Sequence, residues 1–343
     1  MAQDTLRCAV VGVGRMGRHH ARVYAQMPDA ELIGVVDRDV DRARDIVEEW
    51  GGTAWGSIDA LIDAGVDAVT IATPTTNHRQ AAEQLLAAGV ACLIEKPLAP
   101  TAEDAAAIAE AAQRAGVALQ VGHVVRYDPV MQAIKSLGDI NPRHLELHRI
   151  SPMTFRSVDV GVVLDMMIHD LDLLTMLVGL APETVAASSV AVLGAAEDVC
   201  NVRMTYQLDD EGHECVANLT ASRLAMKTER TLRIITEEMY ISADFVSRKV
   251  KVIRKAANAD QIAELRERLA GGEDLSDLNY LDVIEFEDLQ VDDREPLRLQ
   301  AEDFLSAVRD GTPPEIDAEA GSLAVQVAER IIESARGGQL SLA

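Results

Sequence analysis

The sequence predicts an α/β domain with a doubly wound parallel sheet, followed by an α+β domain whose open sheet is mainly antiparallel. Up to about residue 122, short apolar runs without a helical period alternate with amphipathic segments, which is typical of strand–helix–strand units. Beyond that residue, strand-like runs follow one another without intervening helices. Because 343 residues are many for a single hydrophobic core, we expect two domains, 1–122 and 123–343, with the final helices able to pack back on the first.

The first domain alternates strands with helices. Right-handed crossovers join parallel strands of this kind, so the carboxyl ends of the strands meet at one edge of the sheet, where ligands bind. The expected strands cover 8–11, 32–36, 66–72, 91–94 and 117–121, and the expected helices cover 17–27, 40–50, 79–88 and 102–115.

The second domain begins with a short helix and then changes to successive strands, which favours antiparallel pairing. The acidic stretch that ends at Glu295 receives no strand or helix. The expected strands cover 144–150, 185–192, 199–208, 214–222, 231–235 and 250–253, and the expected helices cover 127–137, 161–178, 260–269, 296–309 and 318–335.

The first strand runs directly into the motif Gly12-x-Gly14-x-x-Gly17, in which Arg15 and Met16 separate the last two glycines. Glycine at the first position permits a tight turn, at the second it lets a pyrophosphate approach the backbone, and at the third it lets the helix pack against the strand. Asp37 follows the second strand, 20 residues after the last glycine. A strand before the motif, a helix after it and this acid together predict a Rossmann dinucleotide-binding domain.

Asp37 also bears on the choice of cofactor. A carboxylate at this position accepts hydrogen bonds from the adenosine ribose and repels a 2′-phosphate, which favours NAD over NADP. The neighbouring Arg38 could instead hold a 2′-phosphate, so NADP stays as the alternative. Other polar residues follow strands at the same edge of the sheet and are further candidates for the site: Thr73, Glu95, Lys96 and His123.

Composition excludes several classes of partner. A net charge of −24 argues against nucleic acid and anionic membranes. The most apolar segment, 160–180, carries four ionisable residues, and the first seven residues are polar, so we expect neither a membrane span nor a signal peptide. The four cysteines show no Cys-x-x-Cys spacing, which favours reduced structural thiols and a cytoplasmic protein.

The expected helix 161–178 is apolar on most sides but carries Asp165, His169 and Asp172 at positions i, i+4 and i+7. This spacing places the three side chains on one face of the helix, where buried polar groups need partners or a wet cavity. The spacing alone leaves three interpretations open. His169 could be a core histidine satisfied by carboxylates, the three groups could bind a metal, or Asp165 could orient His169 for acid–base catalysis.

Several motifs occur together and in one order along nearly the whole chain: the glycine motif, Thr73-Pro74 with Asn77-His78, Glu95-Lys96-Pro97, and Asp165-x-x-x-His169. The ending adds Glu295-Pro296-Leu297 and Gly311-Thr312-Pro313-Pro314. This combination resembles the glucose–fructose oxidoreductase/inositol dehydrogenase family (Gfo/Idh/MocA) of NAD(P)-dependent sugar dehydrogenases.

The resemblance implies a role for individual residues. Lys96, Asp165 and His169 would be the catalytic group, with no metal. The histidine would take the hydroxyl proton while hydride leaves the same carbon for the nicotinamide, and the lysine would hydrogen-bond the reacting oxygen. The residues implied in cofactor binding are Gly12, Gly14, Arg15, Met16, Gly17, Asp37, Arg38, Thr73, Pro74, Asn77, His78, Glu95, Lys96 and His123. One departure is the segment Val160-Gly161-Val162-Val163 before Asp165, where many members have a glycine run, and it predicts a narrower pocket.

The stretch from His123 to Arg156 is locally basic, with five Lys and Arg residues against three acids. This balance could be surface scatter, or it could form an anion-binding wall for a phosphorylated or nucleotide-linked sugar. The segment around Arg149–Asp170 resembles most a branch of the family that oxidises UDP-N-acetylglucosamine at its 3-hydroxyl. The expected substrate-binding residues are Lys96, Arg126, Tyr127, Arg149, Arg156, Asp165 and His169, with Arg143 as a further cation of the wall.

Two other functions stay open: an inositol or free-sugar dehydrogenase of the same family, and a non-catalytic NAD(P)-binding regulator. The presence of Lys96, Asp165 and His169 together argues against the regulator, which has no use for all three. Because an antiparallel sheet with one exposed face usually needs covering, we also expect a homodimer or homotetramer.

Overall fold

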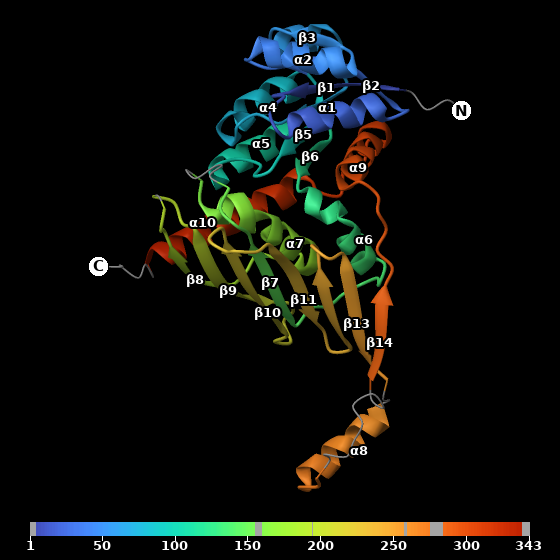
Figure 1. The fold of residues 1–343 in the computed structure, drawn as a ribbon, viewed down its shortest axis with the longest axis vertical. Helices are drawn as coiled ribbons and strands as arrows, with labels where there is room; N and C mark the ends of the chain where they lie inside the picture. Colours follow the sequence, from blue (N-terminus) through green and yellow to red (C-terminus); the bar gives the residue numbers. More distant parts are fainter. Residues whose placement is uncertain (1–4, 155–159, 194, 257–258, 275–283, 338–343) are drawn as a thin grey trace.

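The computed structural model describes residues 5–154, 160–193, 195–256, 259–274 and 284–337. Two sheets lie one above the other, with helices between them and around the first (Figure 1). The first is a six-stranded parallel sheet in the order β3-β2-β1-β4-β5-β6. The second has eight strands in the order β14-β13-β12-β11-β7-β10-β9-β8. The predicted α/β plus α+β architecture is confirmed.

The central strands of the first sheet are buried along their whole length, which is typical of a parallel sheet covered on both faces. Strand order reverses between β1 and β4, and such a reversal opens a crevice for ligands at the carboxyl ends of the strands. The strands are β1 (Leu6–Val11), β2 (Ala30–Val36), β3 (Thr53–Trp55), β4 (Ala68–Ile71), β5 (Ala91–Glu95) and β6 (Leu119–Gly122). The helices are α1 (Gly17–Gln26), α2 (Val40–Trp50), α3 (Ile58–Asp63), η1 (Thr75–Asn77), α4 (His78–Ala87) and α5 (Ala102–Ala115).

The second sheet has one covered and one open face. Its inner strands alternate buried and less buried residues, and α6, α7 and α10 cover the buried side (Figure 1). Neighbouring strands are antiparallel except for the parallel pair β7 and β10. The strands are β7 (His144–Ile150), β8 (Thr184–Val190), β9 (Val199–Gln207), β10 (Glu214–Ser222), β11 (Glu229–Ile235), β12 (Met239–Asp244), β13 (Lys249–Lys255) and β14 (Ile284–Leu289). The helices are η2 (Val124–Tyr127), α6 (Pro129–Lys135), η3 (Val163–Met167), α7 (Ile168–Val178), α8 (Ala259–Ala270), α9 (Pro296–Asp310) and α10 (Ala318–Gly337).

The last two helices tie the domains together. Phe304 and Leu305 of α9 belong to the same hydrophobic core as Val10 of β1 and Tyr24 of α1. Helix α10 supplies Ala328 and Ile331 to the core of the second sheet, while Val325 packs in the core of the first. The two sheets are therefore held at a fixed spacing by one continuous helix.

Among the strands and α-helices of the described residues, four escaped the sequence analysis: β3, α3, β12 and β14. The first two are short, with three and six residues, and their periodicity is too brief to detect. Strand β14 lies in the acidic stretch that received no structure, and as an edge strand it tolerates Glu285 and Glu287. The helix predicted at 161–178 is also not a uniform α-helix, because η3 is a π-helical turn that precedes α7.

Among the described residues, no helix is both long and apolar enough to cross a membrane. All four cysteines are buried free thiols.

Candidate active site

The glycine motif forms the turn between β1 and α1. Gly12 has a φ of +85°, and a Cβ there would lie 2.8 Å from the backbone N of Thr73. A Cβ on Gly17 would lie 1.8 Å from the carbonyl oxygen of Gly12. A Cβ on Gly14 would meet nothing within 4 Å, and no side chain caps the start of α1. The turn therefore leaves open space in front of free helix N–H groups, which fits a pyrophosphate.

Asp37 lies where β2 ends, beside the glycine turn. Its carboxylate accepts hydrogen bonds from the backbone N–H of Val13 (2.8 Å) and of Asp39 (2.9 Å). Arg42 Nη1 lies 3.6 Å from Asp37 Oδ2, a partner that the sequence analysis missed, whereas the neighbouring Arg38 is exposed. The acid is thus fixed in place at the position where a ribose is bound on this fold.

His78 and Glu95 are both buried and hold neighbouring parts of the fold in place. His78 Nδ1 lies 3.1 Å from the carbonyl oxygen of Pro97, and its Nε2 lies 3.0 Å from that of Thr73. Glu95 Oε1 lies 2.8 Å from Nε2 of the buried His20, another residue that the sequence analysis missed. These contacts fix the loops after β4 and β5, and a role of either residue in cofactor binding stays a prediction. Thr73, Pro74 and Asn77 stay accessible to solvent on the β4 loop.

Lys96 connects the two domains. It directly follows β5, and its Nζ donates to the backbone oxygen of Asp165 at 2.7 Å, with Asp165 Oδ1 at 3.4 Å. Asp165 lies in the π-helical turn η3, where the irregular backbone presents a carbonyl oxygen to a side chain. Burial lowers the pKa of Lys96, and the charges of Asp165 and Glu95 partly offset that effect.

Glu197 stabilises the turn η3. Its side chain accepts a hydrogen bond from the backbone N–H of Val163 (3.2 Å). A Cβ on Gly161 would lie 2.0 Å from that carboxylate, which explains the single glycine here. Val162 and Val163 are buried in the core of the second domain. These two valines therefore serve the core packing, and the expectation that the departure from the family's glycine run narrows the pocket stays a prediction.

His169 lies one helical turn beyond Asp165 and is surrounded by cations. Burial lowers its pKa well below 6.5, and the charges of Lys96, Arg149 and Arg230 lower it further. The ring is therefore neutral near pH 7 and able to accept a proton. Its Nδ1 is buried without a hydrogen-bond partner. Asp165 makes no hydrogen bond to this Nδ1; within the described residues its side chain contacts Lys96.

His123, after β6, is fully buried beside His169. The two rings meet edge to face, with centroids 6.5 Å apart and an angle of 82° between the planes. Both ring nitrogens of His123 lack a hydrogen-bond partner, and burial lowers its pKa. An unpaired buried imidazole is costly, so these nitrogens are candidates for contact with a cofactor or a bound water.

The basic stretch does not form a wall of free cations. Arg126 binds Asp172 through two hydrogen bonds of 2.7 and 2.9 Å, and both side chains are almost completely buried. This pair places the carboxylate of Asp172 against a cation. Arg149 makes a similar buried pair with Asp170, and Arg143 pairs with Glu237 on the surface.

Tyr127 and Arg156 are the remaining residues of the expected substrate-binding set. The hydroxyl of Tyr127 donates to Asp303 at 2.7 Å and so faces α9. Arg156 lies outside the described residues. The structure thus brings together Lys96, Asp165, His169 and, through Asp170, Arg149, while Arg126 and Tyr127 act within the fold.

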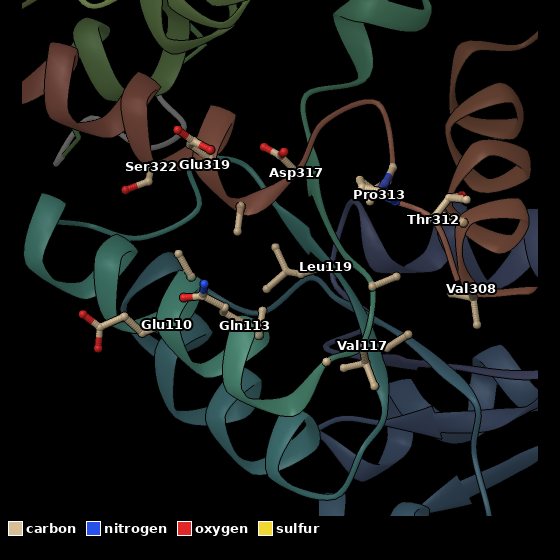
Figure 2. Close-up of a pocket in the computed structure, with 18 of the residues that line it drawn as sticks. Glu110, Gln113, Val117, Leu119, Val308, Thr312, Pro313, Asp317, Glu319 and Ser322 are labelled. Atoms are coloured by element: carbon tan, nitrogen blue, oxygen red, sulfur yellow. The ribbon is translucent and has the colours of Figure 1, made fainter. Parts of the chain in front are cut away.

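A separate pocket lies at the opposite edge of the first sheet, between α5 and α10. Glu110 and Gln113 of α5 face Asp317 and Glu319 across it (Figure 2). Its lining includes the residues that precede β4 and β6, which places it at the amino ends of the strands. Among the described lining residues there is no Lys, Arg or His, so the catalytic candidates lie elsewhere.

Comparison with known proteins agrees with this geometry. Residues 6–123 match the family model described as "Oxidoreductase family, NAD-binding Rossmann fold", and residues 153–342 match that of its C-terminal alpha/beta domain. The chain belongs to the Gfo/Idh/MocA oxidoreductase family. It is accordingly an NAD(P)-dependent oxidoreductase that acts on CH–OH groups of sugars.

Two curated relatives and one solved structure illustrate the range. The UDP-N-acetylglucosamine 3-dehydrogenase of Acidithiobacillus ferrooxidans is 35% identical, over 92% of this chain and 93% of that protein. A crystal structure of that enzyme has a TM-score of 0.85 and covers 97% of this chain and 98% of its own at 34% identity. The NAD(+)-dependent scyllo-inositol 2-dehydrogenase of Bacillus subtilis is 32% identical over 52% of this chain and 55% of its own length.

The glycine turn provides a matched pair of variants. Gly14→Ala adds a Cβ in open space, so the free energy of unfolding should change by less than about 0.5 kcal/mol, while NAD affinity falls by about tenfold or more. Gly17→Ala places its Cβ against the Gly12 carbonyl and should destabilise the fold by about 1–3 kcal/mol. Denaturant unfolding and NAD titration measure the two effects. Unchanged NAD affinity in Gly14→Ala would show that the pyrophosphate lies elsewhere.

Proposed function

We propose that this chain is an NAD-dependent dehydrogenase that oxidises the 3-hydroxyl of UDP-N-acetylglucosamine to a ketone. The observation that carries the proposal is the neutral, half-buried His169 beside the Lys96–Asp165 contact, at the edge of the sheet that also presents the glycine turn. The choice of substrate is supported by the relative that is 35% identical over nearly the whole chain.

His169 is the proton acceptor in this proposal. Its Nδ1 is buried, so Nε2 is the nitrogen left to face a substrate hydroxyl. When NAD is bound, it supplies the acceptor for the hydride that leaves the carbon bearing this hydroxyl, and the C–OH group becomes a ketone. Its pyrophosphate would lie on the Gly12–Gly17 turn and its adenosine ribose at Asp37, with Thr73, Pro74 and Asn77 along the loop beyond.

Lys96 has two functions in this arrangement. We place its ammonium group beside the reacting oxygen, where it stabilises the negative charge that develops as the proton leaves. The same charge lowers the pKa of His169 and so keeps the base neutral. Asp165 anchors Lys96 from the opposite domain and offsets part of its charge.

A cyclitol or free sugar is the competing substrate, because inositol dehydrogenases are also among the relatives. The share of sequence they match is smaller, which favours the nucleotide sugar. We further propose that another copy of the chain covers the open face of the second sheet in a homodimer or homotetramer. We also propose a cytoplasmic location, because four free thiols suit a reducing compartment.

The substrate is tested directly by NADH formation. We expect UDP-N-acetylglucosamine to reduce NAD, while myo-inositol and free glucose react poorly. Because the equilibrium of ketone formation is unfavourable, the assay should contain a carbonyl-trapping amine or a partner aminotransferase. Activity on myo-inositol with none on any UDP-sugar would overturn the choice of substrate and leave the dehydrogenase intact.

Cofactor preference should follow Asp37. Its carboxylate repels a 2′-phosphate, so NAD should bind at least about tenfold more tightly than NADP, and Asp37→Ser should reduce that ratio. Fluorescence titration of both cofactors measures the ratio. Equal or tighter binding of NADP by the unmodified protein would mean that Arg38 and Arg42 determine the preference.

His169→Ala should lower turnover by about 10²- to 10⁴-fold with nearly unchanged NAD affinity. Because the pKa of His169 lies well below 6.5, oxidation by the unmodified enzyme should be lost only as pH falls through that lowered value. The pH profile of kcat/KM reports this acidic limb. His213→Ala, at an exposed histidine between β9 and β10, is the control. Near-normal turnover in His169→Ala would place the base elsewhere.

A further inference from the structure

Two arginines lie directly opposite each other on neighbouring strands beside the catalytic residues. Arg149 of β7 pairs in register with Arg230 of β11, two residues beyond the pair Leu147 and Leu232. Since side chains alternate along a strand, both arginines lie on the same face as these two buried leucines, which is the face covered by helices. Like charges directly opposite destabilise a sheet, so the arrangement requires a compensating negative charge.

Only part of that compensation is present within the described residues. Arg149 is held by Asp170, with N–O distances of 2.6, 3.0 and 3.0 Å. Arg230 has no carboxylate within ion-pair distance in the described part of the chain, although Asp170 and Asp128 act on it from farther away. Its side chain is accessible to solvent. Arg230, the exposed member of the pair, is therefore available to bind an external anion.

The position of Arg230 connects it to the reaction. Asp170, which anchors Arg149, is the residue after His169, and the charges of Arg149 and Arg230 both act on His169. Arg248, between β12 and β13, adds a third guanidinium near Asp128. In a protein of net charge −24, a local group of cations is what allows an anionic substrate to approach.

We propose that Arg230 binds a phosphate group of the substrate at the entrance to the active site, with Arg149 as the fixed cation beside it. The inference rests on the proposed nucleotide-sugar substrate and names the residue that holds its diphosphate. The guanidinium fork matches phosphate oxygens, and Asp170 keeps Arg149 from moving away from its like-charged neighbour. Arg230 thereby takes the role that the sequence analysis gave to Arg126 and Arg143, which the fold uses for other contacts.

The experiment compares Arg230→Gln with Arg233→Gln. Arg233 lies on the same strand but pairs with Glu146, so it controls for removal of one positive charge from β11. We expect Arg230→Gln to weaken binding of UDP to the NADH-loaded protein by about 10- to 100-fold, as for loss of hydrogen bonds to a charged group. The KM for UDP-N-acetylglucosamine should rise by a similar factor with kcat changed less than about threefold. Arg230→Lys should recover part of the affinity, because it keeps the charge and loses the fork.

Calorimetric titration with UDP and with pyrophosphate reads binding without turnover, and unchanged thermal unfolding shows that the variants are folded. Equal UDP affinity in Arg230→Gln and the unmodified protein overturns the inference while leaving the dehydrogenase intact. An equal loss in Arg233→Gln overturns it as well, because net charge alone would then explain binding. If UDP binding depends on Arg230 but UDP-N-acetylglucosamine yields no NADH, the proposed reaction fails and the phosphate site stands.

Discussion

The contact between Lys96 and Asp165 is the constraint on which the rest of the site depends. Lys96 follows a strand of the first sheet, and Asp165 lies in the π-helical turn that begins the long helix of the second domain. The remaining architecture holds these two points together: α10 contributes to both cores, and α9 packs against β1 and α1. The proposed hydride transfer requires such a junction, because in that proposal the first domain supplies the nucleotide-binding turn and the second supplies the proton acceptor.

Charge is arranged around this junction in layers. Innermost are His169 and His123, whose pKa values are lowered by burial and which are therefore neutral. Around them lie Lys96 and two buried arginines, whose carboxylate partners come from α7. Because each buried arginine is neutralised by a partner, the fold tolerates cations close to a base that must stay unprotonated. Arg230 adds an exposed cation at the border of this region, which suits an anionic substrate in a protein of net charge −24.

The sequence was informative where local patterns determine structure. The glycine turn, Asp37 and most helices follow from spacing and strand–helix alternation, and α5 is found at its predicted bounds. It was uninformative where contacts between residues far apart in the chain determine the role of a side chain. No local pattern distinguishes Arg126, which forms an ion pair with Asp172, from Arg230, which we propose binds an anion. Only the strand register brings Arg230 beside Arg149. The same holds for His20, which meets Glu95 across 75 residues, and for the π-helical turn that interrupts an otherwise helical pattern.

The central claim is that Lys96 and burial keep His169 neutral as the base of the reaction. Nuclear magnetic resonance of imidazole-labelled protein, with the His169 signal assigned from a His169→Gln variant, measures its pKa directly. The account predicts a value well below 6.5, and a higher value in Lys96→Met, because removing the ammonium removes a charge that disfavours the imidazolium. A His169 ring that is protonated at pH 7, or whose pKa is unaffected by Lys96→Met, would contradict the account.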